Sequence, residues 1–330
     1  NSQQGSPGWC HQDMVQWILL LVLPVATGLN FDAHLRKSRP PDVFGAMQPP
    51  DVSEAAAELR QLLSTDEDEP GMDRAVAAIR GAQRCVIFTG AGISAASGVR
   101  TFRGAGGLWS SLAGRAALIW GGTRIGWRWT PGLVWQRFVE DFYRPIAAAE
   151  PNDGHRALVE LQRRHFGGTE LNEGLCKFIT MNVDGLHQAA GAMSVAELHG
   201  AAGRFHCTRC RMPHVPAIPL AASPQPRCTS CDGRVRPSVC LYGTAMPPEE
   251  WAAALRAVCE LQQGDVMLVV GTSSLVEPAA SLPRRAVDAG ATLIEFNLEA
   301  QTPLTHLVHI SVPGEAARTL RRCVDRVLER

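Results

Sequence analysis

The chain has 330 residues, 45% of them hydrophobic, so it can bury the core of one large domain or of two small ones. Its 32 Lys and Arg residues balance 32 Asp and Glu residues. A net charge of zero excludes a global electrostatic attraction to nucleic acid or to an anionic membrane, and it leaves the partner of the protein open.

The ten cysteines favour a metal site over a disulfide framework. Four of them form two Cys-x-x-Cys pairs, Cys207 with Cys210 and Cys228 with Cys231, and the others are scattered singly. This usage is typical of a reducing compartment. The sequence therefore predicts an intracellular protein and leaves cytoplasm, nucleus and mitochondrion open.

Residues 14–29 (MVQWILLLVLPVATGL) form an apolar run as long as the core of a signal peptide. The run is too short for a membrane span, and it lacks both a preceding basic region and a clean cleavage pattern. A targeting segment and a wrongly assigned gene start, with Met47 as the true start, are the alternatives. The prolines and the acidic run that follow, up to about residue 70, predict disorder apart from a helix over 53–64.

From residue 72 onward, predicted helices and strands alternate. Helical spacing over 72–81 is followed by a continuous apolar run at 85–89 (CVIFT), typical of a strand buried on both faces. Similar runs predict three more strands, at 177–180, 266–270 and 292–296. Helical patterns follow at 278–289 and at about 315–329. This alternation predicts an α/β fold with a doubly wound, Rossmann-like parallel sheet.

Two stretches interrupt the alternation: residues 104–151, rich in Gly and Trp, and the Pro-rich residues 206–235, which hold the cysteine pairs. We expect both to form a smaller lobe, with a substrate cleft between the lobes. The predicted organisation is an N-terminal extension over 1–71 and one folded domain over 72–330. The larger lobe of that domain comprises 72–103, 152–205 and 236–330.

The two cysteine pairs, separated by 17 residues, have the spacing of a tetrahedral zinc site. The predicted ligands are Cys207, Cys210, Cys228 and Cys231. Four thiolates leave no open coordination position, so the ion is predicted to be structural. A zinc ribbon can also bind nucleic acid, and arginines are present at 209, 211, 227 and 234. Since Phe205 is the only aromatic residue nearby that could stack on bases, we do not expect direct nucleic-acid binding.

A glycine motif, Gly90-Ala91-Gly92, follows the strand at 85–89 and leads into a short helix. Backbone N–H groups in this context can hold a pyrophosphate, but a tight turn would use the same glycines. A dehydrogenase would add an acidic residue roughly 20 positions on, to bind the ribose. No acidic residue lies between Gly90 and Val139, so the loop favours a dinucleotide but argues against an ordinary dehydrogenase.

Polar residues also follow the second strand. Asn182 and Asp184 lie where an open parallel sheet places ligand-binding groups, although turn and N-cap chemistry is an alternative reading for both. His199, in Glu-Leu-His-Gly, has a side chain whose ordinary pKa suits a general base, but a single histidine is more often structural. We expect His187 to be structural.

In their order, these motifs resemble those of the sirtuin family over about residues 72–328. The matching segments are Gly-Ala-Gly-Ile-Ser at 90–94, Thr-Phe-Arg at 101–103, Asn-Val-Asp at 182–184, His-Gly at 199–200, the cysteine pairs, Arg-Pro-Ser-Val at 236–239, Gly-Thr-Ser-Ser at 271–274 and Phe-Asn at 296–297. The resemblance implies an NAD-dependent protein-lysine deacylase, similar to the bacterial and mitochondrial subgroup. It also implies NAD as cofactor, one structural Zn²⁺ and acyl-lysine proteins as substrates.

The resemblance also assigns roles to residues. It makes His199 the general base, with Asn182, Asp184 and Arg103 placing the cofactor. The cofactor-binding residues that it implies are Gly90, Ala91, Gly92, Ser94, Thr101, Phe102, Arg103, Trp109, Met181, Asn182, Asp184, Gly271, Thr272, Ser273 and Asn297. In the family, the acyl carbonyl oxygen attacks C1′ of the NAD ribose as nicotinamide leaves. The base then removes a ribose hydroxyl proton, and the products are free lysine and O-acyl-ADP-ribose.

Two positions depart from the family pattern. Met181 replaces a Gln that positions the nicotinamide ribose, and a thioether cannot replace the hydrogen bonds of an amide. Thr244 replaces a Glu in a segment that pairs with the substrate backbone. These changes keep two alternatives open, an NAD-dependent protein ADP-ribosyltransferase and a non-catalytic NAD-binding scaffold. Phe138 and Tyr143 do not reproduce the Tyr-x-x-Arg spacing of family members that prefer succinyl or malonyl groups, so such a preference is not predicted.

Overall fold

The structure, a computed structural model, describes residues 69–101, 119–168, 174–215 and 220–329. The predicted extension up to residue 68, with its helix over 53–64, lies outside the described residues. Residues Ser64–Arg330 form one compact unit, and the account below concerns its described part. Within that part, we find no helix with the length and apolar character needed to cross a membrane.

Six parallel strands form the central sheet, in the order β3-β2-β1-β7-β8-β9. Their bounds are β1 Cys85–Thr89, β2 Cys176–Thr180, β3 Val195–Glu197, β7 Val266–Val270, β8 Thr292–Asn297 and β9 Ile310–Pro313. Strand β1 lies between β2 and β7, with Cys85 beside Cys176 and Val266. From β1 the sheet extends on one side to β2 and β3, and on the other side to β7, β8 and β9. The predicted doubly wound sheet is therefore confirmed.

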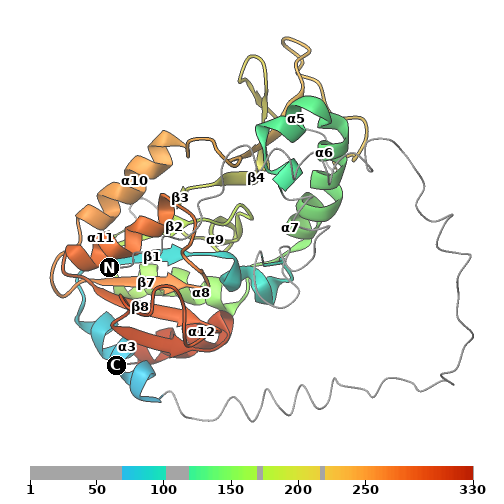
Figure 1. The fold of residues 1–330 in the computed structure, drawn as a ribbon. Coiled ribbons are helices and arrows are strands. Elements are labelled where there is room, and N and C mark those ends of the chain that lie inside the picture. Colours follow the sequence, from blue (N-terminus) through green and yellow to red (C-terminus); the bar gives the residue numbers. More distant parts are fainter. Residues whose placement is uncertain (1–68, 102–118, 169–173, 216–219, 330) are drawn as a thin grey trace, which may run out of the picture. The chain divides into compact units, whose positions relative to one another are not determined.

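Helices cover both faces of the sheet (Figure 1). They are α3 Glu69–Gly81, α8 Asp153–Glu160, α10 Pro248–Cys259, α11 Leu282–Asp288 and α12 Ala316–Leu328. Ile87 and Leu268 pack in the core that contains residues of α3, α8 and α12. Their neighbours Phe88 and Met267 pack in the second core, with α10 and α11. Because successive strand side chains face opposite layers, β1 and β7 are buried along their whole length and read as continuous apolar runs.

Two helices differ from the expected form. The short helix after the glycine motif, Ala91–Ser97, is a 3₁₀ helix that ends at Gly98 in the left-handed conformation. The helix predicted over 278–289 begins with a separate 3₁₀ turn, Ala279–Ser281, before α11. Pro283 lies in the first turn of α11, where a proline is tolerated because the N–H that it lacks has no intrahelical acceptor there.

The small lobe is built from the two predicted insertions. The first supplies α5 Arg124–Trp129, α6 Pro131–Arg137, a π-helical segment Phe138–Tyr143 and α7 Arg144–Ala148. The second supplies β5 and one end each of β4 and β6 in a three-stranded antiparallel sheet, in which β4 Gly200–Cys207 lies between β5 Pro213–His214 and β6 Val235–Val239. Most of β4 and β6 lies outside the predicted bounds 206–235, because strand pairing extends the sheet on both sides of the cysteine pairs. Trp135 of α6 is fully buried, 5.9 Å from the ring of Phe205 on β4. Both insertions therefore contribute to one shared core, as expected.

Candidate active site

The carboxyl edge of the sheet gathers the segments that the sequence singled out. Residues 90–94 follow β1, residues 181–184 follow β2, His199 follows β3, and residues 271–274 follow β7. Asn297 is the last residue of β8. Since all six strands are parallel, these segments share one edge, where the sheet reverses its winding between β1 and β7.

Ser94 links the glycine loop to the segment after β2. Its hydroxyl donates to Asp184 Oδ2 at 2.7 Å and accepts from Asn182 Nδ2 at 3.2 Å. Asn182 Nδ2 also donates to the Gly90 carbonyl at 3.1 Å. The backbone N–H of Leu186 donates to Asp184 Oδ1, so Asp184 also closes the predicted turn. Burial raises the pKa of Asp184, although the bonds from Leu186 and Ser94 oppose this shift.

A buried histidine pair lies behind this network, and His155 is a residue that the sequence reading missed. Its Nδ1 accepts from the Asn152 backbone, which places the ring proton on Nε2, 3.5 Å from Ser94 Oγ. The ring of His187 lies 5.0 Å from that of His155, and its Nε2 lies 2.8 Å from Thr89 Oγ1. Burial lowers the pKa of His155 to about 4 and that of His187 to about 3, so both are neutral near pH 7.

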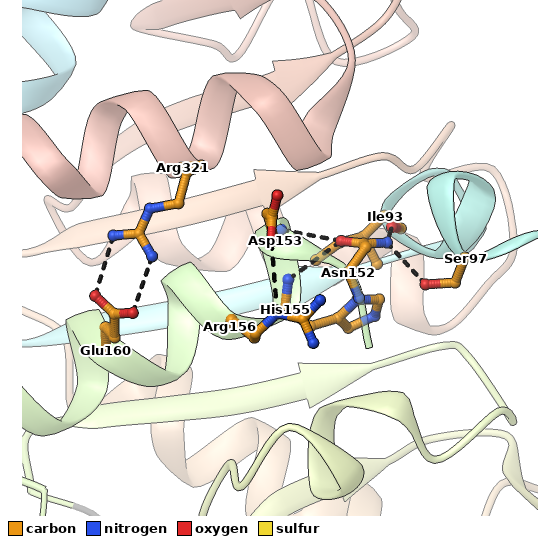
Figure 2. Close-up of polar contacts among 9 residues, drawn as sticks. Ile93, Ser97, Asn152, Asp153, His155, Arg156, Glu160 and Arg321 are labelled. Atoms are coloured by element: carbon orange, nitrogen blue, oxygen red, sulfur yellow. Dashed lines mark hydrogen bonds and ion pairs between the residues drawn. The ribbon is translucent and has the colours of Figure 1, made fainter. Parts of the chain in front are cut away.

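Asn152 fixes the 3₁₀ helix of the glycine loop against α8 (Figure 2). Its amide nitrogen donates to the Ile93 carbonyl at 2.7 Å and to Ser97 Oγ at 3.0 Å. Its side-chain oxygen caps α8 by accepting from the N–H groups of Gly154 and His155. The pattern Asn152-x-x-His155 is a capping box with an imidazole in the third helical position, and this pattern could have indicated the site.

His199 has one nitrogen committed to the protein and the other available. Its Nδ1 donates to the Met181 carbonyl at 3.0 Å, so the lone pair lies on Nε2, for which the described residues provide no partner. Burial lowers the pKa of His199, and the bond to Met181 partly offsets this effect. The half-buried imidazole is thus held in the form that can accept a proton.

The two departures from the family pattern have local explanations. Met181 uses its backbone to bind Thr89 and His199, while its side chain packs against the core beneath α10 and α11. Thr244 Oγ1 donates to the Leu241 carbonyl at 2.6 Å and accepts from the Leu241 N–H at 3.2 Å. Its hydroxyl therefore closes a turn.

The glycines of the two loops pack against each other. A Cβ on Gly92 would lie 2.6 Å from the Gly271 Cα, and one on Gly90 would lie 2.6 Å from Thr272 Cβ. Gly271 has φ +57°, and a Cβ there would lie 2.6 Å from the Ile93 nitrogen. The close packing of the two loops is therefore enough to require these glycines, which agrees with the alternative that they serve a tight turn. Ala91 is the first residue of the 3₁₀ helix.

The loop after β7 is tied to the end of β8. Asn297 Nδ2 donates to the Thr272 carbonyl at 3.1 Å and to Glu295 Oε1 at 3.3 Å. Ser273 lies half-buried between Thr272 and Ser274. The Ser274 hydroxyl is buried, and no described residue bonds to it. An orphaned hydroxyl at this edge fits a ligand with polar groups, which is compatible with the predicted cofactor.

The four predicted zinc ligands meet in space. Their sulfurs all lie within 4.8 Å of one another, with Cys207 Sγ 3.4 Å from Cys231 Sγ and Cys210 Sγ 3.7 Å from Cys228 Sγ. Tetrahedral Zn²⁺ with bonds of about 2.3 Å places its sulfurs about 3.8 Å apart. Gly233 makes room for the cluster, because a Cβ there would lie 2.6 Å from Cys207 Sγ. The arrangement fits one structural zinc ion.

Some predicted site residues lie outside these contacts. Phe102, Arg103 and Trp109 are outside the described residues, and Thr101 is the last residue before that gap. The structure therefore joins Gly90, Ser94, Asn182 and Asp184 by direct hydrogen bonds. A backbone bond from the Gly92 N–H to the Gly271 carbonyl, at 2.8 Å, joins the glycine loop to the segment after β7.

Fold and site together define a doubly wound α/β protein with a four-cysteine small lobe and a polar carboxyl edge. Residues 90–278 match the model of the Sir2 family. The chain therefore belongs to the Sir2 family.

Curated relatives match most of the chain. The NAD-dependent protein deacylase 2 of Pyrobaculum aerophilum is 40% identical over 249 residues, which cover 75% of this chain and 92% of the relative. The NAD-dependent protein deacylase of Thermus thermophilus is 43% identical over 235 residues, covering 70% and 85%. That of Mycobacterium leprae is 38% identical over 249 residues, covering 74% and 98%.

Solved structures of Sir2 proteins share the fold. A Sir2 homologue mutant in complex with ADP-ribose superposes with a TM-score of 0.67 at 34% identity, covering 77% of this chain and 95% of that one. A Sir2 homolog–NAD complex gives 0.67 at 32% identity, with 77% and 93% covered. A Sir2–p53 peptide–NAD⁺ complex gives 0.65 at 28% identity, with 77% and 97% covered.

Proposed function

We propose that this chain is an NAD-dependent protein-lysine deacylase that acts on acyl-lysine side chains, most simply acetyl-lysine. His199 carries the proposal. Its Nδ1 donates to the Met181 carbonyl, so its Nε2 can accept a proton at the same sheet edge that holds the glycine loop. The names of the relatives, NAD-dependent protein deacylases, support the same activity.

NAD supplies the ADP-ribosyl group that takes the acyl group from lysine, with release of nicotinamide. The chain contributes orientation and proton transfer. Asn182, Asp184 and Ser94 form a fixed polar surface through their mutual hydrogen bonds, and we assign to it the placement of the nicotinamide end. We assign the adenosine end to Gly271, Thr272, Ser273 and Asn297, beside the orphaned hydroxyl of Ser274.

His199 then acts as general base. Burial lowers the pKa of His199, so the imidazole is neutral at its working pH. Its Nε2 can then accept a hydroxyl proton from the ribose. The bond from Nδ1 to Met181 keeps the ring in this tautomer and orientation. We assign Phe102, Arg103 and Trp109 to cofactor binding as well, on the sirtuin motif alone.

The proposal also assigns a role to each part of the chain. The Rossmann-like lobe, 72–103, 152–205 and 236–330, would bind the cofactor. The insertions at 104–151 and 206–235 would form the small lobe, and 1–71 would not take part in catalysis. The described cysteines form no disulfide, and four of them are the predicted zinc ligands, in keeping with the reducing compartment that we propose.

The test is an NAD-dependent assay with peptides that carry acetyl-, succinyl- or long-chain acyl-lysine. We expect nicotinamide, free lysine and O-acyl-ADP-ribose, with the acetyl peptide among the substrates. His199→Ala should abolish product formation, whereas the exposed His306→Ala should not. Protein-bound ADP-ribose as the only product would favour an ADP-ribosyltransferase. Absence of nicotinamide release with every peptide would overturn the enzymatic proposal.

A further inference from the structure

Three arginines lie along the chain segments that flank His199, and none of them has a carboxylate partner among the described residues. They are Arg124 at the start of α5, Arg211 after the first cysteine pair and Arg236 on β6. We call this set the arginine surface. Other arginines of the described residues do form ion pairs, such as Arg321 with Glu160 at 3.0 Å.

Arg236 connects the arginine surface to the catalytic segment. Its Nη1 donates to the Pro237 carbonyl at 3.0 Å and to the Val239 carbonyl at 3.1 Å, so the side chain runs along β6. The next residue, Cys240, donates its backbone N–H to the His199 carbonyl at 2.8 Å. The guanidinium of Arg236 thus contacts Val239, the residue before the one whose N–H bonds to the His199 backbone.

His206 lies between Arg211 and Arg236. Strand pairing sets His206 opposite Arg236, and Arg211 Nη1 lies 3.3 Å from His206 Nε2. The other ring nitrogen of His206 lies 2.8 Å from Ser238 Oγ. The guanidinium of Arg211 therefore reaches the β6 face of the small lobe and carries an exposed charge there.

Arg124 joins the set from the other insertion. The Tyr242 N–H donates to the Gly122 carbonyl at 2.7 Å, and Thr123 bridges to Tyr242 and caps α5. This pairing sets Arg124, the first residue of α5, next to the chain that continues from Cys240. The pKa of Arg236 is lowered to about 10, mainly by burial and in addition by the charges of Arg211 and Arg124, as expected for like charges close together.

The sequence offers little negative charge nearby. No acidic residue lies between Gly90 and Val139, and Asp232 is the only one between Phe205 and Pro248. Asp232 is already paired with Arg227 at 3.5 Å. A net charge of zero for the whole chain therefore conceals a locally positive region around β6 and the segment that follows it.

Exposed apolar side chains accompany these charges. Ile125 is 53% exposed and Trp129 is 75% exposed, one helical turn apart on α5 and adjacent to Arg124 and Arg128. Trp and Arg are the residues most enriched among the energetic centres of protein interfaces. Phe205, by contrast, is buried in the small-lobe core, so it offers no platform for stacking bases. Trp129 could also stack on a base, but the exposed aliphatic side chain of Ile125 beside it suits a protein segment, so an acidic protein segment is the ligand that we test and an oligonucleotide is the alternative outcome.

We propose that the arginine surface binds Asp and Glu side chains of the protein substrate, so that the enzyme prefers acyl-lysines with acidic neighbours. This inference rests on the proposed function and names the substrate class of the same site. Arg124 and Arg211 supply exposed charges, and Trp129 supplies an apolar contact beside them. The half-buried Arg236, fixed by two carbonyls, sets the potential close to His199.

The experiment compares acetyl-lysine peptides of equal length, flanked by Asp and Glu, by Ser, or by Lys and Arg. We expect the highest kcat/KM for the acidic peptide at low salt, and a loss of the preference near 1 M salt, where screening acts within about 3 Å. Arg124→Gln and Arg211→Gln should each reduce kcat/KM for the acidic peptide by about two- to fivefold, the range of an exposed ion pair. Activity on the Ser-flanked peptide should not change.

Arg284→Gln is the matched control, because Arg284 is exposed on α11 and paired with Asp288. Zinc content verifies that the Arg211 variant keeps its small lobe. Equal kcat/KM for the acidic and basic peptides, or a preference unchanged in the double variant Arg124→Gln/Arg211→Gln, would overturn the proposal. The proposal would also be overturned if the parent bound all peptides equally well and bound an oligonucleotide, and if the double variant no longer bound that oligonucleotide.

Anisotropy of fluorescein-labelled peptides separates this proposal from the proposed function. Charge-selective binding without turnover of any peptide would contradict deacylation and leave the arginine surface supported. Turnover without charge selectivity would contradict only the arginine surface.

Discussion

The Nδ1–H of His199 donates to the Met181 carbonyl at 3.0 Å, across the ends of two neighbouring strands. The residue that departs from the family pattern therefore holds the proposed base through its backbone. A change of side chain at 181 does not remove that bond. The position of His199 should accordingly tolerate substitutions of Met181 that keep its backbone in place.

The activity should depend on pH through His199. Burial lowers its pKa below the ordinary 6.5, and the neutral form is the base. The rate of the step that follows nicotinamide release should therefore rise with pH, reach half its maximum below pH 6.5, and stay constant above it. A pH profile of O-acyl-ADP-ribose formation under single turnover measures this. An inflection above pH 7 would contradict the assigned environment.

Acid should destabilise the fold through the buried histidine pair. The pKa values of His155 and His187 are lowered in the fold to about 4 and about 3, so below pH 6.5 the unfolded chain binds more protons than the folded one. The stability due to neutral His155 is complete above pH 6.5 and decreases as pH falls, by up to roughly 3 kcal/mol at pH 4. Urea unfolding from pH 7 to 4 measures this decrease.

His187→Gln supplies the comparison for that titration. It should be less stable than the parent at pH 7, because a buried ring is lost, but its stability should fall less steeply with acid. His306→Gln, at an exposed position, should keep the parental slope. If His187→Gln also keeps the parental slope, His187 is not one of the groups that titrate on unfolding.

Asn152 should affect cofactor affinity through the glycine loop. Asn152→Asp keeps an oxygen that caps α8 but removes the amide donor to Ile93 and Ser97. We expect KM for NAD to rise several-fold, together with some loss of unfolding free energy, because a carboxylate oxygen would face the Ile93 carbonyl oxygen. Asn152→Ala loses both functions and should also lose about 1 kcal/mol of stability. Identical KM values for Asn152→Asp and the parent would show that the loop needs no such support.

Removal of zinc should unfold the small lobe. Cys207 and Cys228 belong to the same core as Trp135, so loss of the ion exposes that indole. Cys228→Ser, or treatment with a chelator, should remove the bound zinc, shift the tryptophan emission to longer wavelength and abolish deacylation. Cys259→Ser, on the exposed end of α10, should have no such effect. Full activity after complete zinc loss would contradict a structural role.

The elements that the sequence predicted best are those in which every residue is buried. Strands β1 and β7 were predicted to the residue because burial on both faces leaves an uninterrupted apolar run. Strand β4 lacks such a signal, since a register shift between Ala201 and Phe205 interrupts its alternation. Strand β9 was also missed, because its four residues include Ser311 and Pro313.

Site residues could be predicted where a single short motif contains them. They could not be predicted where their role depends on contact between distant segments. The cysteine spacing and the His-Gly pair could be read locally. His155, by contrast, acquires its role only because Ser94, 61 positions earlier, lies beside it. The same holds for Arg124 and Arg211, which both approach Arg236 only after two insertions fold against each other.

The shared core around Trp135 has a consequence for motion. Each insertion leaves the large sheet and returns to it, and both are joined through one buried cluster, so we expect them to swing as a single rigid body. His199 and Gly200 lie at one of the hinges of that body, where β3 gives way to β4. Because the Nδ1 bond to the Met181 carbonyl ties His199 to the large sheet, the proposed base would keep its place while the small lobe moves.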